Sequence, residues 1–225
     1  GQVRTMVMNI VNAQEDAYDL CITSLADGIN TLAPGGFLAD LNAMAYLGLD
    51  REWWCASITN GMQFGGKLYF NSGSLSPFFY YAPTALVYNI RVAEDLNLSG
   101  FEESVISGTW TIDKLEEYLR GVTTDLNGNG KLDEDDRWAI GHDGGVSGQA
   151  IFFGLGGKMT DLDENGNHIL TMDTEQTVTL VERAASILGD RDLAFAGTTG
   201  SELSVFQKGN TLFLVTSMNN VIAGY

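Results

Sequence analysis

The sequence has 225 residues, of which 44% are hydrophobic, 10% are aromatic and only 18% are charged. Disordered chains show the opposite balance, and this length is enough to bury a core in one large domain or two small lobes. The formal net charge of −17 repels phosphate backbones and anionic lipid heads. We therefore expect no nucleic-acid partner and no peripheral membrane binding.

The chain contains no run of about 18 to 20 apolar residues that could span a bilayer. Its first residues, 1–4, lack the charged-then-apolar order of a signal peptide, so we expect either a cytoplasmic protein or one whose leader has been removed. The two cysteines, Cys21 and Cys55, are too few for a disulfide scaffold, and their pairing is left open. Cys21 lies in an apolar run and is interpreted as a small buried hydrophobe.

Apolar clusters alternate with helical patterns along the chain, which indicates an α/β class. In its first part we expect the tail of a helix, a short strand that is buried on both faces, a turn leading to a short helix, and two further strands. In that order they are Val3–Val11, Asp19–Thr23, Gly35–Leu41, Lys67–Phe70 and Ala85–Tyr88.

The clearest helix runs from Thr111, its expected cap, to Val122, and its apolar residues share one stripe. A second helix is predicted from Thr174 to Leu188, with Gly189 ending it. Its buried face is expected to consist of Val178, Val181, Ala185 and Leu188. Arg137–Ile140 and Thr211–Val215 are predicted strands.

The strongest local motif is the segment 125–136, which matches the twelve-residue EF-hand calcium loop. Gly130 stands at the sixth position, where the loop must turn sharply, and Leu132 is expected to point into the core. The last position is Asp where Glu is usual. A solvated polar turn is the alternative to calcium. The predicted Ca²⁺ ligands are Asp125, Asn127, Asn129, the Lys131 carbonyl, Asp133 and Asp136.

The segment Asp161–Asn167 begins like a second calcium loop, but strand-like residues follow it, so a hairpin turn is the better interpretation. Motifs typical of enzymes are missing from the sequence. The two histidines, His142 and His168, are placed in polar loops, and no serine-hydrolase elbow, Walker loop or zinc-protease helix occurs. No spacing singles out a glycosidase pair among the carboxylates.

Aromatic residues gather in short clusters, the longest being Phe78–Tyr81. Aromatic rings stack on the C–H faces of sugars at a low entropic cost, although most such residues serve in cores. Successive aromatics in a strand must point to both faces. If Phe78–Tyr81 is a strand, some of these side chains, with Tyr80 and Tyr81 as candidates, face a ligand or an interface.

Several segments, in order, resemble motifs of family 1 extracellular solute-binding proteins of bacterial ABC transporters. Tyr18-Asp19-Leu20 with Thr23-Ser24 resembles the family's first ligand loop. Five later segments resemble its Gly-x-Leu turn, Gly-Lys-x-Tyr strand, Tyr-Asn strand, Thr-Trp helix start and Phe-x-x-Gly turn, with individual departures such as Ile90 and Asn210 where Lys is usual. They are Gly36–Leu41, Gly66–Phe70, Leu86–Leu98, Thr109–Leu115 and Phe206–Phe213.

The resemblance implies an α/β, two-lobed periplasmic-binding-protein-like (type II) fold, here a fragment with a partial first lobe, truncated at both ends. Residues 1–81 would form the partial lobe 1. Residues 82–215 would form lobe 2, including the EF-hand-like loop 125–136, and residues 216–225 would start the crossing back to lobe 1. The ligand would lie between the lobes, against Thr23, Ser24, Asp27, Tyr80, Tyr81, Gln149, Phe153, Asn219 and Asn220.

The function implied is capture of a small solute, a mono- or oligosaccharide, for delivery to the permease subunits of an ABC importer. No enzymatic activity is expected. Such a protein would be extracellular or periplasmic, and it would touch a membrane only through a lipid anchor that is absent from this chain. A carbohydrate-active enzyme and a calcium-dependent adhesion module are the alternatives: turnover of a glycan would favour the first, and calcium-dependent surface attachment the second.

Overall fold

The computed structural model describes residues 2–24, 28–165, 167–198 and 200–223, which form a mixed α/β structure. The chain divides into two compact units. The first comprises residues 1–80 and 162–169, and the second comprises residues 81–161 and 170–225. The correspondence of these units to the two expected lobes stays a prediction.

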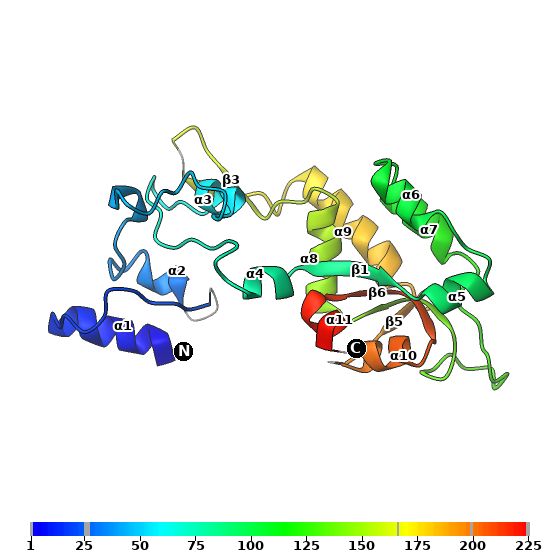
Figure 1. Ribbon diagram of the computed structural model, residues 1–225. Coiled ribbons are helices and arrows are strands. Elements are labelled where there is room, and N and C mark those ends of the chain that lie inside the picture. Colours follow the sequence, from blue (N-terminus) through cyan, green and yellow to red (C-terminus); the bar gives the residue numbers. More distant parts are fainter. Residues whose placement is uncertain (1, 25–27, 166, 199, 224–225) are drawn as a thin grey trace. The chain divides into compact units, whose positions relative to one another are not determined.

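The first unit consists of short helices joined by turns (Figure 1). The expected N-terminal helix is confirmed. Ile29, Leu32 and Leu68 are the large buried apolar residues of this unit among those described. Asp40 ties two segments together, because its carboxylate accepts the backbone N–H groups of Asn42 and Leu68 at 3.0 and 3.1 Å. The helices are α1 (Gln2–Ala13), α2 (Ile29–Leu32), the 3-10 helix η2 (Leu41–Ala43), α3 (Ala56–Gly61) and α4 (Phe78–Tyr81).

Two strands expected in the first unit do not form. Residues 19–23 are irregular, with Leu20 77% and Ile22 89% exposed, and Cys21 is a free, half-buried thiol. Residues 67–70 take part only in an isolated bridge between Phe64 and Lys67. A strand needs a neighbour to satisfy its backbone, and no strand of the described residues pairs with either segment.

The aromatic run at the end of the first unit is also not a strand. Phe78–Tyr81 forms the single-turn helix α4, in which every side chain is exposed, from 36% for Phe79 to 76% for Phe78. The prediction that these rings alternate between two faces is therefore wrong. Pro77 directly precedes the helix, and its fixed φ of about −65° suits the entry to a helical turn.

The second unit is built on a four-stranded sheet with the order β1-β6-β2-β5 (Figure 1). Strand β6 is antiparallel to β1 and parallel to β2, and β2 is parallel to β5. The strands predicted at residues 85–88, 137–140 and 211–215 are confirmed. The bounds are β1 (Thr84–Tyr88), β2 (Trp138–His142), β5 (Ala194–Ala196) and β6 (Thr211–Ser217).

Strand β6 is buried on both faces from Thr211 to Thr216, as expected for a continuous apolar run in the middle of a sheet. Phe213 packs into a core shared with Phe101 and Trp110, at centroid distances of 5.4 and 6.2 Å. On the other face, Leu214 lies beside Gly141 and Glu202, because a Cβ built on Gly141 would meet both side chains. Helices therefore cover both faces of the sheet.

Seven helices are described in the second unit, and their starts follow the expected capping chemistry. The hydroxyl of Thr111 accepts the N–H of Lys114, and that of Thr174 accepts the N–H of Thr177, both at 3.2 Å. Asn89 caps in the same way. The helices are α5 (Ile90–Asp95), α6 (Phe101–Ile106), α7 (Ile112–Leu119), α8 (Gly145–Gly154), α9 (Glu175–Leu188), α10 (Ser201–Gln207) and α11 (Met218–Ala223).

Helix α9 forms where predicted but buries a different face. Thr177, Ala184 and Ile187 are buried, whereas Val178 and Val181 are 48% and 45% exposed. The buried face of the helix is thus rotated by about one residue from the face that was predicted. Burial of Thr177 is possible because its hydroxyl donates to the carbonyl of Thr171 at 2.7 Å, which removes the cost of an unpaired polar group.

The hairpin expected around residues 161–167 is confirmed as the pair β3 (Thr160–Leu162) and β4 (His168–Leu170). Asp163 holds its turn by accepting the N–H groups of Asn165 and Asn167 at 2.9 and 2.8 Å. His168 contacts the carbonyl of Gln63 at 2.7 Å within the first unit.

The face that α9 buries can be tested by two substitutions on the same helix. Ile187→Ala removes a fully buried side chain and should lower the free energy of unfolding by about 3 kcal/mol. Val178→Ala, at a half-exposed position, should change it by less than about 0.5 kcal/mol. Urea unfolding measures both values. Equal losses in the two variants would show that the predicted stripe, not the observed one, faces the core.

Candidate functional site

The carboxyl ends of the parallel strands β2, β5 and β6 form one edge of the sheet in the second unit. His142 of β2 pairs with Ala196 of β5, and the N–H of Gly197 continues this pairing to the carbonyl of His142 at 2.9 Å. Helix α8 begins beyond β2 and helix α11 beyond β6. Ligands of open α/β sheets bind outside such an edge, which makes it the candidate site.

His142 closes strand β2 and is 4% exposed, so its placement in a polar loop was wrong. Its Nδ1 accepts the N–H of Gly144 at 3.0 Å, and its Nε2 lies 2.9 Å from the carbonyl of Leu188. Because the Gly144 N–H can only donate, Nδ1 is unprotonated and Nε2 carries the proton. Burial lowers the pKa of His142, against the opposing effects of the Leu188 carbonyl, Asp143 and Glu202.

Asp143 and Ser147 fix the start of α8. The Asp143 carboxylate accepts both the N–H and the hydroxyl of Ser147, at 3.0 and 2.7 Å. The Ser147 hydroxyl, fully buried, also lies 3.2 Å from the carbonyl of Val215 on β6. Gly144 precedes the helix at a φ of 87°, a conformation that glycine adopts without strain. The first turn of α8 is therefore locked to both neighbouring strands.

Glu202 lies buried at the start of α10, below the same edge. Its two carboxylate oxygens accept the N–H of Gly200 at 3.3 and 3.1 Å. A Cβ at Gly197 would stand 2.7 Å from this carboxylate, so the turn after β5 requires glycine. Together with Asp143 it gives the edge a negative potential, which disfavours anionic ligands.

Four predicted ligand residues lie on the two helices that start at this edge. Gln149 and Phe153 belong to α8, and both side chains are exposed, Phe153 by 49%. Asn219 is exposed on α11, while the amide of Asn220 donates to the hydroxyl of Thr216 at 3.0 Å. Since β2 and β6 are adjacent strands, the starts of α8 and α11 lie at the same edge.

The other predicted ligand residues belong to the first unit, except Tyr81, which is the first residue of the second. Thr23 is half-buried and Ser24 is exposed, both in irregular chain, and Asp27 lies outside the described residues. Tyr80 and Tyr81 are exposed on α4, by 58% and 41%. The buried strand that was expected to position Thr23, Ser24 and Asp27 does not form in the described residues. The sequence pattern therefore no longer supports a ligand contact at these three positions.

The EF-hand-like loop curls around its first residue. Asp125 accepts the N–H groups of Gly128 and Gly130, each at 2.7 Å, and Asn127 and Asn129 accept the N–H groups two residues further on. Leu132 is 37% exposed, so its predicted place in the core is wrong.

The far end of the loop is tied to the sheet. Asp136 is fully buried, and its carboxylate accepts the N–H groups of Leu126 and Asp133, at 2.8 and 2.9 Å. These backbone hydrogen bonds, that of Asp133 most strongly, lower the pKa of Asp136. The indole of Trp138, the first residue of β2, donates to the Asp133 carbonyl at 2.7 Å. Within the described part of the chain, no three His, Cys, Asp or Glu side chains are gathered to hold a metal ion.

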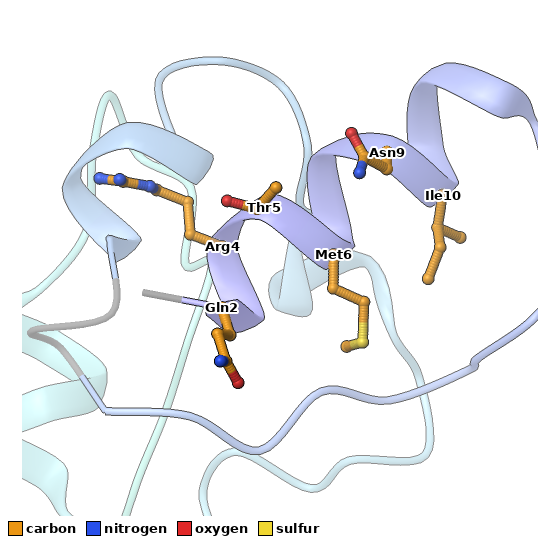
Figure 2. Close-up of a pocket in the computed structure, with 6 residues that line it drawn as sticks. All are labelled: Gln2, Arg4, Thr5, Met6, Asn9 and Ile10. Carbon is orange, nitrogen blue, oxygen red and sulfur yellow. The ribbon is translucent and has the colours of Figure 1, made fainter.

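A hollow of about 660 Å³ runs along helix α1 in the first unit (Figure 2). Figure 2 shows Gln2, Met6 and Ile10 projecting on one side of the helix, and Arg4 on another. Every lining residue belongs to this single helix, so no polar groups from different elements converge there. We therefore do not consider it a binding site.

Comparison with known proteins yields one distant similarity. No family model and no curated protein matches the sequence. Among solved structures, the chain is similar to the ABC substrate-binding protein Lmo0181 from Listeria monocytogenes in complex with cycloalternan, with 13% identity and a TM-score of 0.46. The alignment covers 96% of this chain and 58% of that one. A similarity of this extent establishes neither the family nor the fold of this chain.

The polar residues that organise the edge, His142, Asp143, Ser147 and Glu202, were not identified from the sequence as site residues. A signal for the first three is present, because an apolar strand followed by His-Asp-Gly-Gly and a helix is typical of a strand-to-helix turn at a sheet edge. Glu202 gives no such signal, since nothing in its segment distinguishes it from a solvated carboxylate.

None of the described helices is long and apolar enough to cross a membrane.

The protonation state of His142 predicts a pH effect on stability. Its pKa is lowered in the folded state, so the unfolded chain binds the proton first as the pH falls. The free energy of unfolding should therefore be insensitive to this group above about pH 7.5 and should decrease from there towards about pH 5.5.

His142→Gln, which keeps an N–H donor for Leu188 and does not titrate, serves as the control for carboxylates that titrate elsewhere. Urea unfolding of both proteins across this pH range measures the difference between them. Wild type should lose its advantage over the variant as the pH falls. A difference that stays constant with pH would contradict the assigned neutral imidazole.

Proposed function

We propose that this chain is part of an extracellular solute-binding protein of a bacterial ABC importer and that it captures a neutral sugar. The observation that carries the proposal is the convergence of three of the resemblance segments in one core. The side-chain amide of Asn89 donates to the carbonyl of Phe206 at 3.4 Å. The rings of Tyr88 and Trp110 both pack against Phe213. Motifs about 100 residues apart thus hold the same sheet.

In this proposal the sugar lies at the carboxyl edge of the sheet in the second unit. Gln149 and Asn219 present exposed amides, each with donors and acceptors that suit a network of hydroxyl groups. Phe153, half exposed on α8, offers a ring on which the C–H face of a sugar can stack. The negative edge and the net charge of −17 favour a neutral ligand over an anionic one.

The finer parts of the proposal follow the family resemblance. The protein would have two lobes of the type II arrangement, with the ligand held between them. Thr23, Ser24, Asp27, Tyr80 and Tyr81 would contribute from the first lobe, and Asn220 would support Asn219 from the second. The protein would act outside the cytoplasm, held by a lipid anchor or free in a periplasm, and would pass its solute to permease subunits without chemical conversion.

A thermal-shift screen with neutral mono- and oligosaccharides tests this function. A sugar at 100 times its dissociation constant should stabilise the chain by about 2.7 kcal/mol. Mass spectrometry of the recovered sugar should find it unchanged, whereas a cleaved product would indicate the carbohydrate-active enzyme instead. The absence of any stabilising sugar in the screen would contradict the proposal.

The predicted contacts are tested on the sugar that the screen identifies. Gln149→Ala and Phe153→Ala should each weaken its binding about tenfold or more, because each removes a directed contact worth about 1.5 kcal/mol. The control is Val178→Ala on α9, since Val178 is 48% exposed and lies outside the predicted contacts. Isothermal titration gives the affinities. Unchanged affinity in both test variants would place the ligand elsewhere.

We further propose that the loop 125–136 binds one structural Ca²⁺ through Asp125, Asn127, Asn129, the Lys131 carbonyl, Asp133 and Asp136. The spacing of oxygen side chains and the sharp turn at Gly130 support this. The carboxylates of the described loop are not gathered around one point, so binding requires the Asp133 and Asp136 side chains to rearrange. The ion would then anchor the loop that precedes β2.

Calcium should raise the melting temperature of the chain, and EDTA should remove that gain. Asp125→Ala should abolish the difference, because it removes the ligand around which the loop curls. The matched control is Asp163→Ala, which breaks a similar turn in the β3–β4 hairpin and should keep the calcium effect. Identical melting of the wild-type protein in calcium and in EDTA would leave the loop as a polar turn.

A further inference from the structure

The second unit contains an apolar cavity of about 320 Å³ that the proposed sugar site does not use. It lies on the face of β1 and β6, under helix α6. Phe101 and Phe213 form its floor, and both are almost fully buried. Leu86 and Trp110 line it as well, and Tyr88 faces Phe213 across paired positions of β1 and β6. Its volume lies within the range of small-molecule sites.

The rim of the cavity exposes apolar surface that the fold does not explain. Val105 and Ile106 of α6 line it and are 60% and 87% exposed. Helix α6 thus presents two large aliphatic side chains to solvent beside a hollow floored by aromatic rings. Apolar surface gathered in a concave place is typical of ligand sites, whereas single exposed residues are not.

A single charged side chain, Glu102, is among the residues that line this cavity. The hydroxyl of Tyr88 donates to one oxygen of Glu102 at 2.8 Å, which fixes the carboxylate at the cavity. Glu103 follows it on the same helix and adds to the negative potential. Lys114, whose Nζ lies over the ring of Tyr118, is paired with Glu117 at 2.6 Å. The cavity therefore keeps a negative field.

We propose that this cavity binds a small organic cation, an ammonium group attached to an apolar alkyl or aryl body. The body would fill the hollow over Phe101, Phe213 and Trp110. The ammonium group would meet the Glu102 carboxylate and the electron-rich faces of the aromatic rings. A neutral molecule of the same shape would gain only the apolar contacts, and an anion would be repelled by Glu102.

The site is separate from the carboxyl edge of the sheet. Tyr88 and Phe213 are paired near the amino end of β6, whereas the edge lies beyond Ser217 at its other end. Occupation of the cavity by a cation should therefore leave sugar binding unchanged. The inference does not depend on the proposed sugar-binding function, and the two can fail independently.

The test uses phenethylamine as the probe and 2-phenylethanol, its neutral counterpart, as the comparison, both titrated into the whole chain and followed by NMR. Phenethylamine should bind saturably, shift the resonances of Trp110 and Ile106, and bind about tenfold tighter than the alcohol, as a charge-assisted contact predicts. Equal affinity for the two, or no shifts at these residues, would overturn the proposal.

Two matched variants separate the Glu102 contact from the general acidity of the chain. Glu102→Gln keeps an acceptor for Tyr88 but removes the charge, and it should bring the two affinities together. Glu103→Gln makes the same change of charge one residue away, outside the lining, and should retain the preference for the amine. A third variant, Ile106→Ser, should weaken both probes. If Glu103→Gln lost the preference as fully as Glu102→Gln, the selective site would not exist.

Discussion

The second unit depends on the burial of one strand, β6, on all sides. Its neighbours β1 and β2 satisfy its backbone, and helices cover both of its faces, so Leu212 and Leu214 are fully excluded from water. A strand of this kind must lie in the middle of a sheet, because an unpaired backbone in an apolar environment would cost more than its side chains gain. The pairing of β6 with an antiparallel β1 and a parallel β2 then fixes where the helices can pack.

This arrangement determines the position of the candidate site. Because β2, β5 and β6 run in the same direction, their carboxyl ends meet at one edge, and the chain must turn there to start α8 and α11. The turn buries polar groups, and each is satisfied locally: His142 by Leu188 and Gly144, and Ser147 by Asp143 and Val215. These contacts fix the start of α8 at the edge, and such preorganisation favours binding.

Much of the second unit could be predicted from its sequence. Thr111 caps its helix where expected, the helix predicted at residues 174–188 forms, and the apolar runs at residues 85–88 and 211–215 are strands, because capping and burial act over a few residues. The buried face of α9 was predicted wrongly, because the hydroxyl of Thr177 finds a local partner, the carbonyl of Thr171 just before the helix, which the spacing of apolar residues does not reveal.

The first unit shows the same limit more strongly. Residues 19–23 and 67–70 have the composition of strands, but no neighbouring strand is described for them. Phe78–Tyr81 was likewise interpreted as a strand from its composition, but it forms a single helical turn after Pro77. Of the candidate site, the exposed residues Gln149 and Phe153 were inferred from a family resemblance, while the buried Glu202 requires the fold to be recognised.

The proposed sugar site lies at the carboxyl edge of the sheet in the second unit. Hydrogen exchange of the backbone amides, measured with and without a saturating sugar, tests it most directly. A sugar bound there should slow the exchange of residues 143–149, which form the turn and first part of α8, and of residues 218–220 at the start of α11. Protection confined to other segments, with these two unchanged, would contradict it.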